Sequence, residues 1–200
     1  MLIALALMAQ GPTLDADTTK AAMTCAAASS AASDATRPTG ERYLVGVAEM
    51  TYFAMTAARP GPAGRAFLDR VGERVDILNR GPVTPLPEAK ALLPQCDARF
   101  PLARRAAPSK LPLMELDRNL MCTGSAVFLA GAAKTTDGTD PSIQWLEPFR
   151  ERFQGLTDAQ RAPGGALANQ AVFQDKFAAQ LIASLDFGNL LSIARACRAL

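Results

Sequence analysis

Residues 65–80 read RAFLDRVGERVDILNR, and this stretch carries the clearest helical pattern in the chain. Apolar side chains recur there at three- and four-residue steps, while charged side chains occupy the positions between them. The apolar set is Phe67, Leu68, Val71, Val75 and Leu78. One face of an amphipathic helix would therefore rest on a core. Gly81 and Pro82 follow, and this pair is typical of a helix end, so we predict a helix over residues 63–80.

Further helices are predicted on both sides of this one. Three of them cover residues 15–34, 41–59 and 113–134, and a last one covers 190–197. A short helix starts at about Thr84-Pro85 and is kinked or split by Pro94, and another starts at Asp140-Pro141 and is interrupted at Pro148. One more helix carries a four-residue ladder of apolar side chains: Phe173, Phe177, Leu181 and Leu185. No alternating apolar pattern remains that would indicate a strand. The predicted fold class is therefore all-α.

The composition excludes several kinds of chemistry. The chain is 49% hydrophobic with a formal net charge of +2, which suits a packed core and argues against a nucleic-acid partner. It contains no histidine. Ser-His-Asp and Cys-His nucleophile systems, and zinc sites that use imidazole, are thereby excluded in their usual forms. We predict neither a cofactor nor a metal site.

The first residues indicate export. Residues 1–9 read MLIALALMA, and a Gln-Gly-Pro sequence follows at 10–12. We interpret residues 1–11 as a signal-peptide-like segment that lacks the usual positive n-region, with a periplasmic or secreted mature protein. A frayed first turn of a cytosolic helix is the alternative. Neither this segment nor the charge-free stretch 119–133 is long and apolar enough to predict a transmembrane span.

The four cysteines fall at nearly matched spacings: Cys25, Cys96, Cys122 and Cys197. Flanking sequences are also parallel, for example MTCAAASSAAS (23–33) with LMCTGSAVFLAG (120–131), which suggests an internal duplication. Four cysteines allow three pairings, and a duplication favours Cys25 with Cys96 and Cys122 with Cys197. Four unpaired, buried thiols in a reducing compartment are the alternative. We predict two tandem, similar four-helix units, each closed by a disulfide.

This interpretation divides the chain into four parts. They are the signal-like segment 1–11, helical unit 1 over 12–97, a Pro/Arg-rich connector over 98–112, and helical unit 2 over 113–200. The connector carries Arg99, Arg104, Arg105 and Lys110, and residues 98–112 contain no acidic residue to balance them. We expect a solvated linker there, with an anion-binding strip as the alternative.

The only catalytic candidates, both weak, are the carboxylates of Glu147 and Glu49. Glu147 and Glu151 lie four residues apart on one predicted helix face, but Arg150 and Arg152 flank them, which favours a solvated charged surface. Glu49 stands in an otherwise apolar helix, where a buried carboxylate with a raised pKa would mark a functional site. Pairing of Glu49 with Arg42, with Arg59 or with a helix end is the ordinary alternative.

The same helix offers a candidate binding groove. Tyr43, Tyr52, Phe53 and Met55 would line it for an apolar ligand or a partner helix. Packing of these side chains in the core is the default interpretation of such a stripe.

The stretch YLVGVAEMTYF (43–53) lies between a helix with a leading cysteine, Cys25, and a helix with a closing one, Cys96; Cys122 and Cys197 repeat this layout. It resembles small exported, disulfide-containing helical proteins of bacteria. Some similarly built periplasmic proteins are type VI secretion immunity proteins, which bind and block a toxin. The resemblance implies an all-helical fold and a protein partner.

Three hypotheses about function follow from the sequence. The first is an exported, non-catalytic helical protein that binds a protein or a small apolar ligand. The second is an envelope hydrolase that uses Glu49 or Glu147 as a general acid; a fully solvated Glu147 and an ion-paired Glu49 would count against it. The third is a cytosolic helical protein with free thiols.

Overall fold

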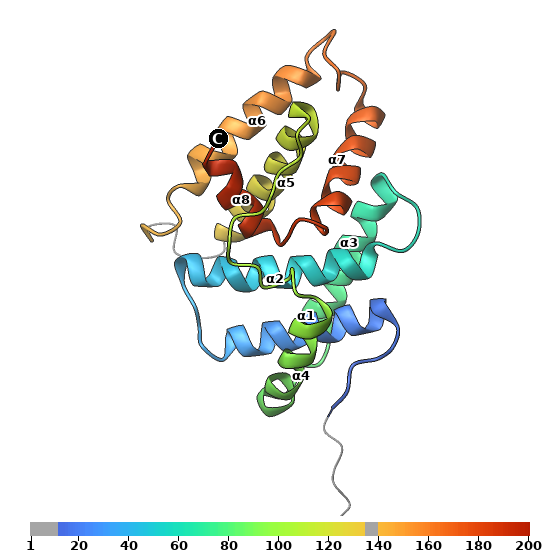
Figure 1. Cartoon of the computed structure of the whole chain (residues 1–200), viewed down its shortest axis with the longest axis vertical. Coiled ribbons are helices and arrows are strands. Elements are labelled where there is room, and N and C mark those ends of the chain that lie inside the picture. Colours follow the sequence, from blue (N-terminus) through green and yellow to red (C-terminus); the bar gives the residue numbers. More distant parts are fainter. Residues whose placement is uncertain (1–11, 135–139) are drawn as a thin grey trace, which may run out of the picture.

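The computed structural model describes residues 12–134 and 140–200, and these ranges form eight α-helices and no strand (Figure 1). The helices are α1 (Thr18–Asp34), α2 (Gly40–Ala58), α3 (Arg65–Arg80), α4 (Leu86–Arg99), α5 (Glu115–Ala133), α6 (Leu146–Arg161), α7 (Gln170–Ser184) and α8 (Leu190–Arg198). The all-α prediction is confirmed. The predicted signal segment, residues 1–11, lies outside the described residues.

Two proline positions differ from the sequence prediction. Pro94 lies inside α4, which runs as one helix from Leu86 to Arg99, so Pro94 does not split it. The helix expected to start at Asp140-Pro141 starts instead at Leu146, after a run of turns. Pro148 therefore falls in the first turn of α6, where a missing backbone N–H costs no helical hydrogen bond, and it interrupts nothing.

Two disulfides join helices within each half of the chain. Cys25 of α1 bonds to Cys96 of α4 across 71 positions, and Cys122 of α5 bonds to Cys197 of α8 across 75. No cysteine is free. The cysteine pairing favoured by the sequence is confirmed. The alternative of four unpaired thiols disagrees with this bonding. Disulfides persist in oxidising compartments, so this bonding indicates a location outside the reducing cytosol.

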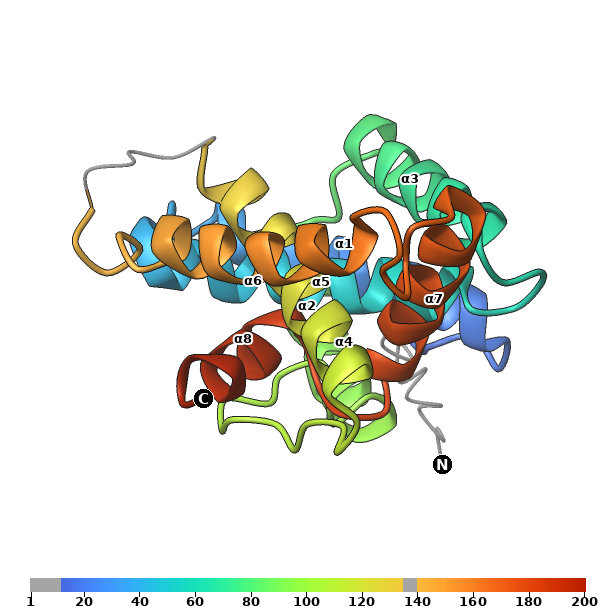
Figure 2. The same ribbon diagram turned by 90° about the horizontal axis from the view of Figure 1, so that it is seen from above.

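Helix α2 lies at the centre of the molecule. It packs against α1 and α3 from its own half and against α5 and α8 from the other half. Figure 1 shows α2 between α1 on one side and α5 and α8 on the other, and in Figure 2, seen from above, α6 passes in front of it. One core cluster accordingly draws buried residues from both halves, from Ala21 to Cys197. The two halves are not separate bodies, because they share this core.

The connector between the halves is bound to the second half. Phe100 and Ala103 are buried, and Asn189 donates hydrogen bonds to the carbonyl oxygens of Ala103 and Arg105 at 2.8 and 3.1 Å. The backbone N–H of Ser109 donates to the Ser192 carbonyl at 3.1 Å. The expected solvated linker was therefore wrong for this part of the connector, since its backbone finds partners on α8 and the turn before it.

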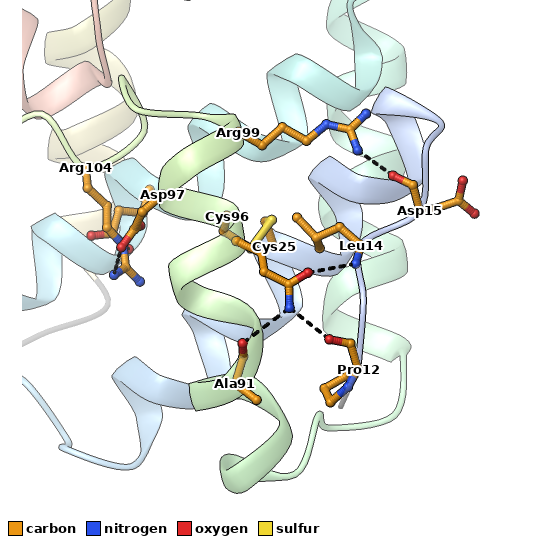
Figure 3. Close-up of a disulfide and its surroundings, with 11 residues drawn as sticks. Pro12, Leu14, Asp15, Cys25, Ala91, Cys96, Asp97, Arg99 and Arg104 are labelled. Carbon is orange, nitrogen blue, oxygen red and sulfur yellow. Dashed lines mark hydrogen bonds and ion pairs between the residues drawn. A yellow bond between two sulfur atoms is a disulfide. The ribbon is translucent and has the colours of Figure 1, made fainter. Parts of the chain in front are cut away.

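The segment that leads into α1 is held against α4 beside the first disulfide (Figure 3). The Gln95 side chain accepts a hydrogen bond from the Leu14 backbone N–H at 3.2 Å and donates one to the Pro12 carbonyl at 2.8 Å. Arg99 donates to the Ala16 carbonyl at 2.7 Å. One helix thus fixes residues 12–16 through two side chains.

Among the described residues, no helix combines the length and hydropathy that a membrane span requires.

Candidate functional site

Glu147 lies on the surface of α6. Its side chain is 53% exposed and pairs with Arg150, whose Nε donates to Glu147 Oε2 at 3.1 Å. The hydrogen bond from Arg150 lowers the pKa of Glu147 below its ordinary value. A general acid needs a raised pKa near neutrality, so this environment works in the opposite direction.

Glu49 is largely buried and ion-paired. Its side chain is 13% exposed, and Oε2 lies 3.3 Å from Nε of Arg104 in the connector. Burial raises the pKa of Glu49, and the positive charge of Arg104 works against that rise. The partners named from the sequence were wrong, because Arg104 takes this place while Arg59 pairs with Asp186 at 3.1 Å. With Glu49 paired and Glu147 solvated, the geometry lends no support to the hydrolase hypothesis.

The groove predicted on α2 does not form. Tyr52, Phe53 and Met55 are buried in the core, with 7%, 1% and 1% of their surfaces exposed. The Tyr52 hydroxyl donates to the Leu185 carbonyl at 3.3 Å. The fourth predicted residue, Tyr43, is half-buried and borders a surface hollow. The prediction failed because α2 is covered by helices of both halves, so its apolar faces are used in packing.

A groove is present elsewhere, over α5 and between α6 and α7; we call it the α5 groove. Its floor is formed by Thr123, Val127 and Gly131 of α5, and Phe173 and Phe177 of α7 form one wall. The opposite wall comes from α6, with Arg150, Gln154, Thr157, Asp158 and Arg161, and Lys134 lies at one end. The hollow measures about 430 Å³. Figure 1 shows α6 and α7 on the two sides of α5.

Close packing shapes the floor and one wall of the α5 groove. The hydroxyl groups of Thr123 and Thr157 lie 2.7 Å apart and join α5 to α6. The rings of Phe173 and Phe177 are 5.6 Å apart. Val127 stays 44% exposed between these walls, although it is an apolar residue in the middle of a helix. An uncovered apolar floor of this kind is typical of a binding surface.

Cationic side chains line the rim of the α5 groove. The Arg161 guanidinium lies over the Phe173 ring, 4.5 Å from its centroid, and Arg161 also donates to Gln170 at 3.0 Å. Arg150 is held by Glu147 and Gln154. The lining thus holds three cations, Lys134, Arg150 and Arg161, of which Arg150 pairs with Glu147 and Arg161 with the lining carboxylate Asp158 at 3.8 Å, so one positive charge is left in excess. The rim favours an anionic group on whatever occupies the groove.

Sequence reasoning missed this groove, although one of its signals was visible. The four-residue ladder of Phe173, Phe177, Leu181 and Leu185 predicted one face of a helix. Only Leu181 and Leu185 are fully buried, while Phe173 and Phe177 are half-buried. The periodic pattern identifies the apolar face of α7. It does not show which part of that face other helices cover and which part stays open.

No protein-family model matches the chain, and searches of curated proteins and of solved structures find no significant match.

Proposed function

We propose that this protein is a non-catalytic binding protein of the periplasm, and that its α5 groove receives an acidic amphipathic helix of a partner protein. The observation that carries the proposal is an open groove with an apolar floor and three cations on its rim. It agrees with the protein partner that the resemblance to immunity proteins implies.

The floor suits a helix. Thr123, Val127 and Gly131 follow one another at four-residue steps, so they form one stripe along α5. Nothing lies within 4 Å of a Cβ built on Gly131, and a small residue there lets another backbone come close. Helix-in-groove recognition uses apolar anchors at such spacings. The rings of Phe173 and Phe177 would pack against those anchors.

The charges suit an acidic partner. Lys134, Arg150 and Arg161 outnumber Asp158 along the lining. Arg150 is already oriented by Glu147 and Gln154, which reduces the entropy lost when it binds a carboxylate. Complementary charge of this kind speeds association and selects the partner more than it adds affinity.

Two finer features of the sequence interpretation belong to the same proposal. Export explains why two disulfides are retained, and a duplicated unit explains why α1 with α4 and α5 with α8 are bridged in the same way. In the first half α1 packs against α2, α4 and α3, and in the second half α5 packs against α6, α8 and α7. The parallel roles of α1 and α5 support descent from one four-helix unit.

Site-specific photo-crosslinking in envelope extract tests the proposal. A crosslinker replaces Val127 in the groove, and a second protein carries it at Val83, an exposed residue before α4 that serves as the control. We expect one protein adduct at position 127 that maps to an acidic helical segment, and none at 83. Lys134→Glu should weaken that adduct about tenfold, since it reverses one rim charge, whereas Lys90→Glu on α4 should not.

Two outcomes would overturn the proposal. Equal adducts at positions 127 and 83, or none at 127, would mean that the groove has no protein partner. Native mass spectrometry that finds a small apolar molecule bound in the purified protein, lost on Val127→Trp, would assign the groove to a ligand instead.

A further inference from the structure

A second hollow lies between α1 and α2, away from the α5 groove, and measures about 320 Å³. Helix α1 contributes Ser29 and Ser33, the turn after it contributes Thr36, and α2 contributes Arg42 and Glu49. Arg104 of the connector also lines this hollow, which we call the α1–α2 pocket. Its volume is within the range of about 300–1,000 Å³ that is typical of ligand sites.

Helical spacing explains how these polar groups meet. Ser29 and Ser33 are four residues apart, so they share one face of α1, and Thr36 follows in the turn after the helix. Arg42 and Glu49 are two turns apart on one face of α2, a separation of about 10 Å along the helix axis. A Cβ on Gly46, between them, would lie only 2.6 Å from the Ser33 hydroxyl, so the two helices come together at this glycine.

One polar atom in the pocket is buried without a partner. Ser29 is 3% exposed, and its Oγ makes no hydrogen bond of good geometry with a described residue, although its hydroxyl lies close enough to the Glu49 carboxyl to lower the pKa of Glu49. Buried hydroxyl groups are normally hydrogen-bonded, because an unsatisfied one costs about 1–3 kcal/mol. An unpaired Oγ beside a carboxylate is suited to a donor supplied by a ligand.

The charges at the inner end of the pocket are unbalanced. Nε of Arg104 lies 3.3 Å from Glu49 and 3.2 Å from Asp97, so one guanidinium serves two carboxylates. This group therefore carries an excess negative charge, in surroundings where Glu49 is mostly shielded from water. Arg42, at the other end, is exposed and supplies a positive charge.

We propose that the α1–α2 pocket binds a small zwitterion such as a free α-amino acid or a dipeptide, with its ammonium group between Glu49 and Ser29 and its carboxylate toward Arg42. An ammonium group has three N–H donors and a positive charge, so it satisfies the Ser29 hydroxyl and balances the shared guanidinium at once. Arg42 provides the donors that a carboxylate prefers. This site is independent of the α5 groove and does not depend on its partner.

Calorimetric titration of the full chain with a panel of α-amino acids and dipeptides tests the inference. For any compound that binds, Glu49→Gln should weaken affinity about 10- to 100-fold, because the isosteric amide removes the charge-assisted contact. Ser29→Ala should weaken it by a smaller factor. Lys90→Ala, on the exposed side of α4, is the matched control and should change nothing.

Two modified compounds separate the ends of the pocket. The N-acetyl form of a bound amino acid lacks the ammonium group and should not bind. Its methyl ester lacks the carboxylate, so it should bind wild type and Arg42→Ala equally, while the parent compound binds Arg42→Ala more weakly. The inference is overturned if no compound binds at millimolar concentration, or if Ser29→Ala and Glu49→Gln, both folded by circular dichroism, bind as wild type does.

Discussion

The hydroxyl groups of Ser109 and Ser192 lie 2.8 Å apart in a buried contact between the connector and α8. Ser109 also reaches the Phe187 carbonyl, to which its hydroxyl donates at 3.0 Å. Gly188 lies beside this contact with a φ of +152°, and a Cβ there would come within 2.7 Å of the Ser109 hydroxyl. The chain between the halves is therefore positioned by the residues that start α8.

Asn189 is the residue on which this attachment depends most. It caps α8 by accepting from the Ser192 N–H at 2.9 Å, and its amide also holds two connector carbonyls. Asn189→Ala should lower the free energy of unfolding by about 2–4 kcal/mol, because it removes a cap and leaves buried carbonyls unpaired. Urea denaturation measures the loss.

Asn169 provides the matched control for that experiment. It caps α7 by accepting from the Ala171 N–H at 2.9 Å, but it is exposed and serves no other segment. Asn169→Ala should cost only about 1 kcal/mol. Equal losses for the two variants would show that the connector contacts contribute nothing.

Gly124 marks the closest approach of α5 and α7. A Cβ at this position would lie 2.7 Å from Leu181 Cδ2, in the core. Gly124→Ala should therefore destabilise the protein by about 1–3 kcal/mol through overpacking. Gly155→Ala in α6 has nothing within 4 Å of the new Cβ, and it should stabilise the protein by about 0.5–1 kcal/mol. Thermal denaturation should shift in opposite directions, and a shared direction would contradict the packing.

The two disulfides should contribute about equally to stability. They close loops of 71 and 75 positions, for which the chain-entropy relation gives roughly 4 kcal/mol each. The double variants Cys25→Ser/Cys96→Ser and Cys122→Ser/Cys197→Ser should each lose a similar amount in urea denaturation. A loss confined to one pair would mean that the other bridge joins helices already fixed by packing. Mass spectrometry of the native wild type should show about four fewer hydrogens than the reduced chain.

Glu49 gives stability a defined pH dependence. Burial raises its pKa above the ordinary value of 4.5, so the native state holds this proton more tightly than the unfolded chain does. The contribution of Glu49 is thus fully present below pH 4.5 and is lost as the pH rises through the raised pKa. Relative to Glu49→Gln, wild type should lose stability as the pH rises above 4.5. A relative gain over this range would mean that Arg104 outweighs the cost of burial.

Local patterns predicted much of the fold. The spacing in 65–80, the Gly-Pro ends and the paired cysteine positions led to the helices and to both bridges, because each depends on residues near one another or on a repeated order. The start at Asp140 was misplaced, since Asp140 holds Ser142 in a turn by accepting its N–H at 2.9 Å, and such a pattern also suits a helix cap.

The sites were harder to predict, because tertiary packing decides them. Glu49 pairs with Arg104, and no local spacing in the sequence links these two residues. Likewise Val127 and Phe128 are both apolar residues of the helix predicted over 113–134. Val127 nevertheless faces the open α5 groove, while Phe128 packs against the core. A helical period identifies an apolar face, but tertiary packing decides which helix covers that face.

Gln95 and Arg99 hold Pro12 and Ala16 against α4, at the end of the molecule formed by α1 and α4, while α5, α6 and α7 lie at the other end (Figure 1). An affinity handle or a surface attachment joined at Pro12 would therefore start on the side away from the α5 groove. Immobilisation through that point presents the groove to solution, which makes it the natural orientation for a capture assay.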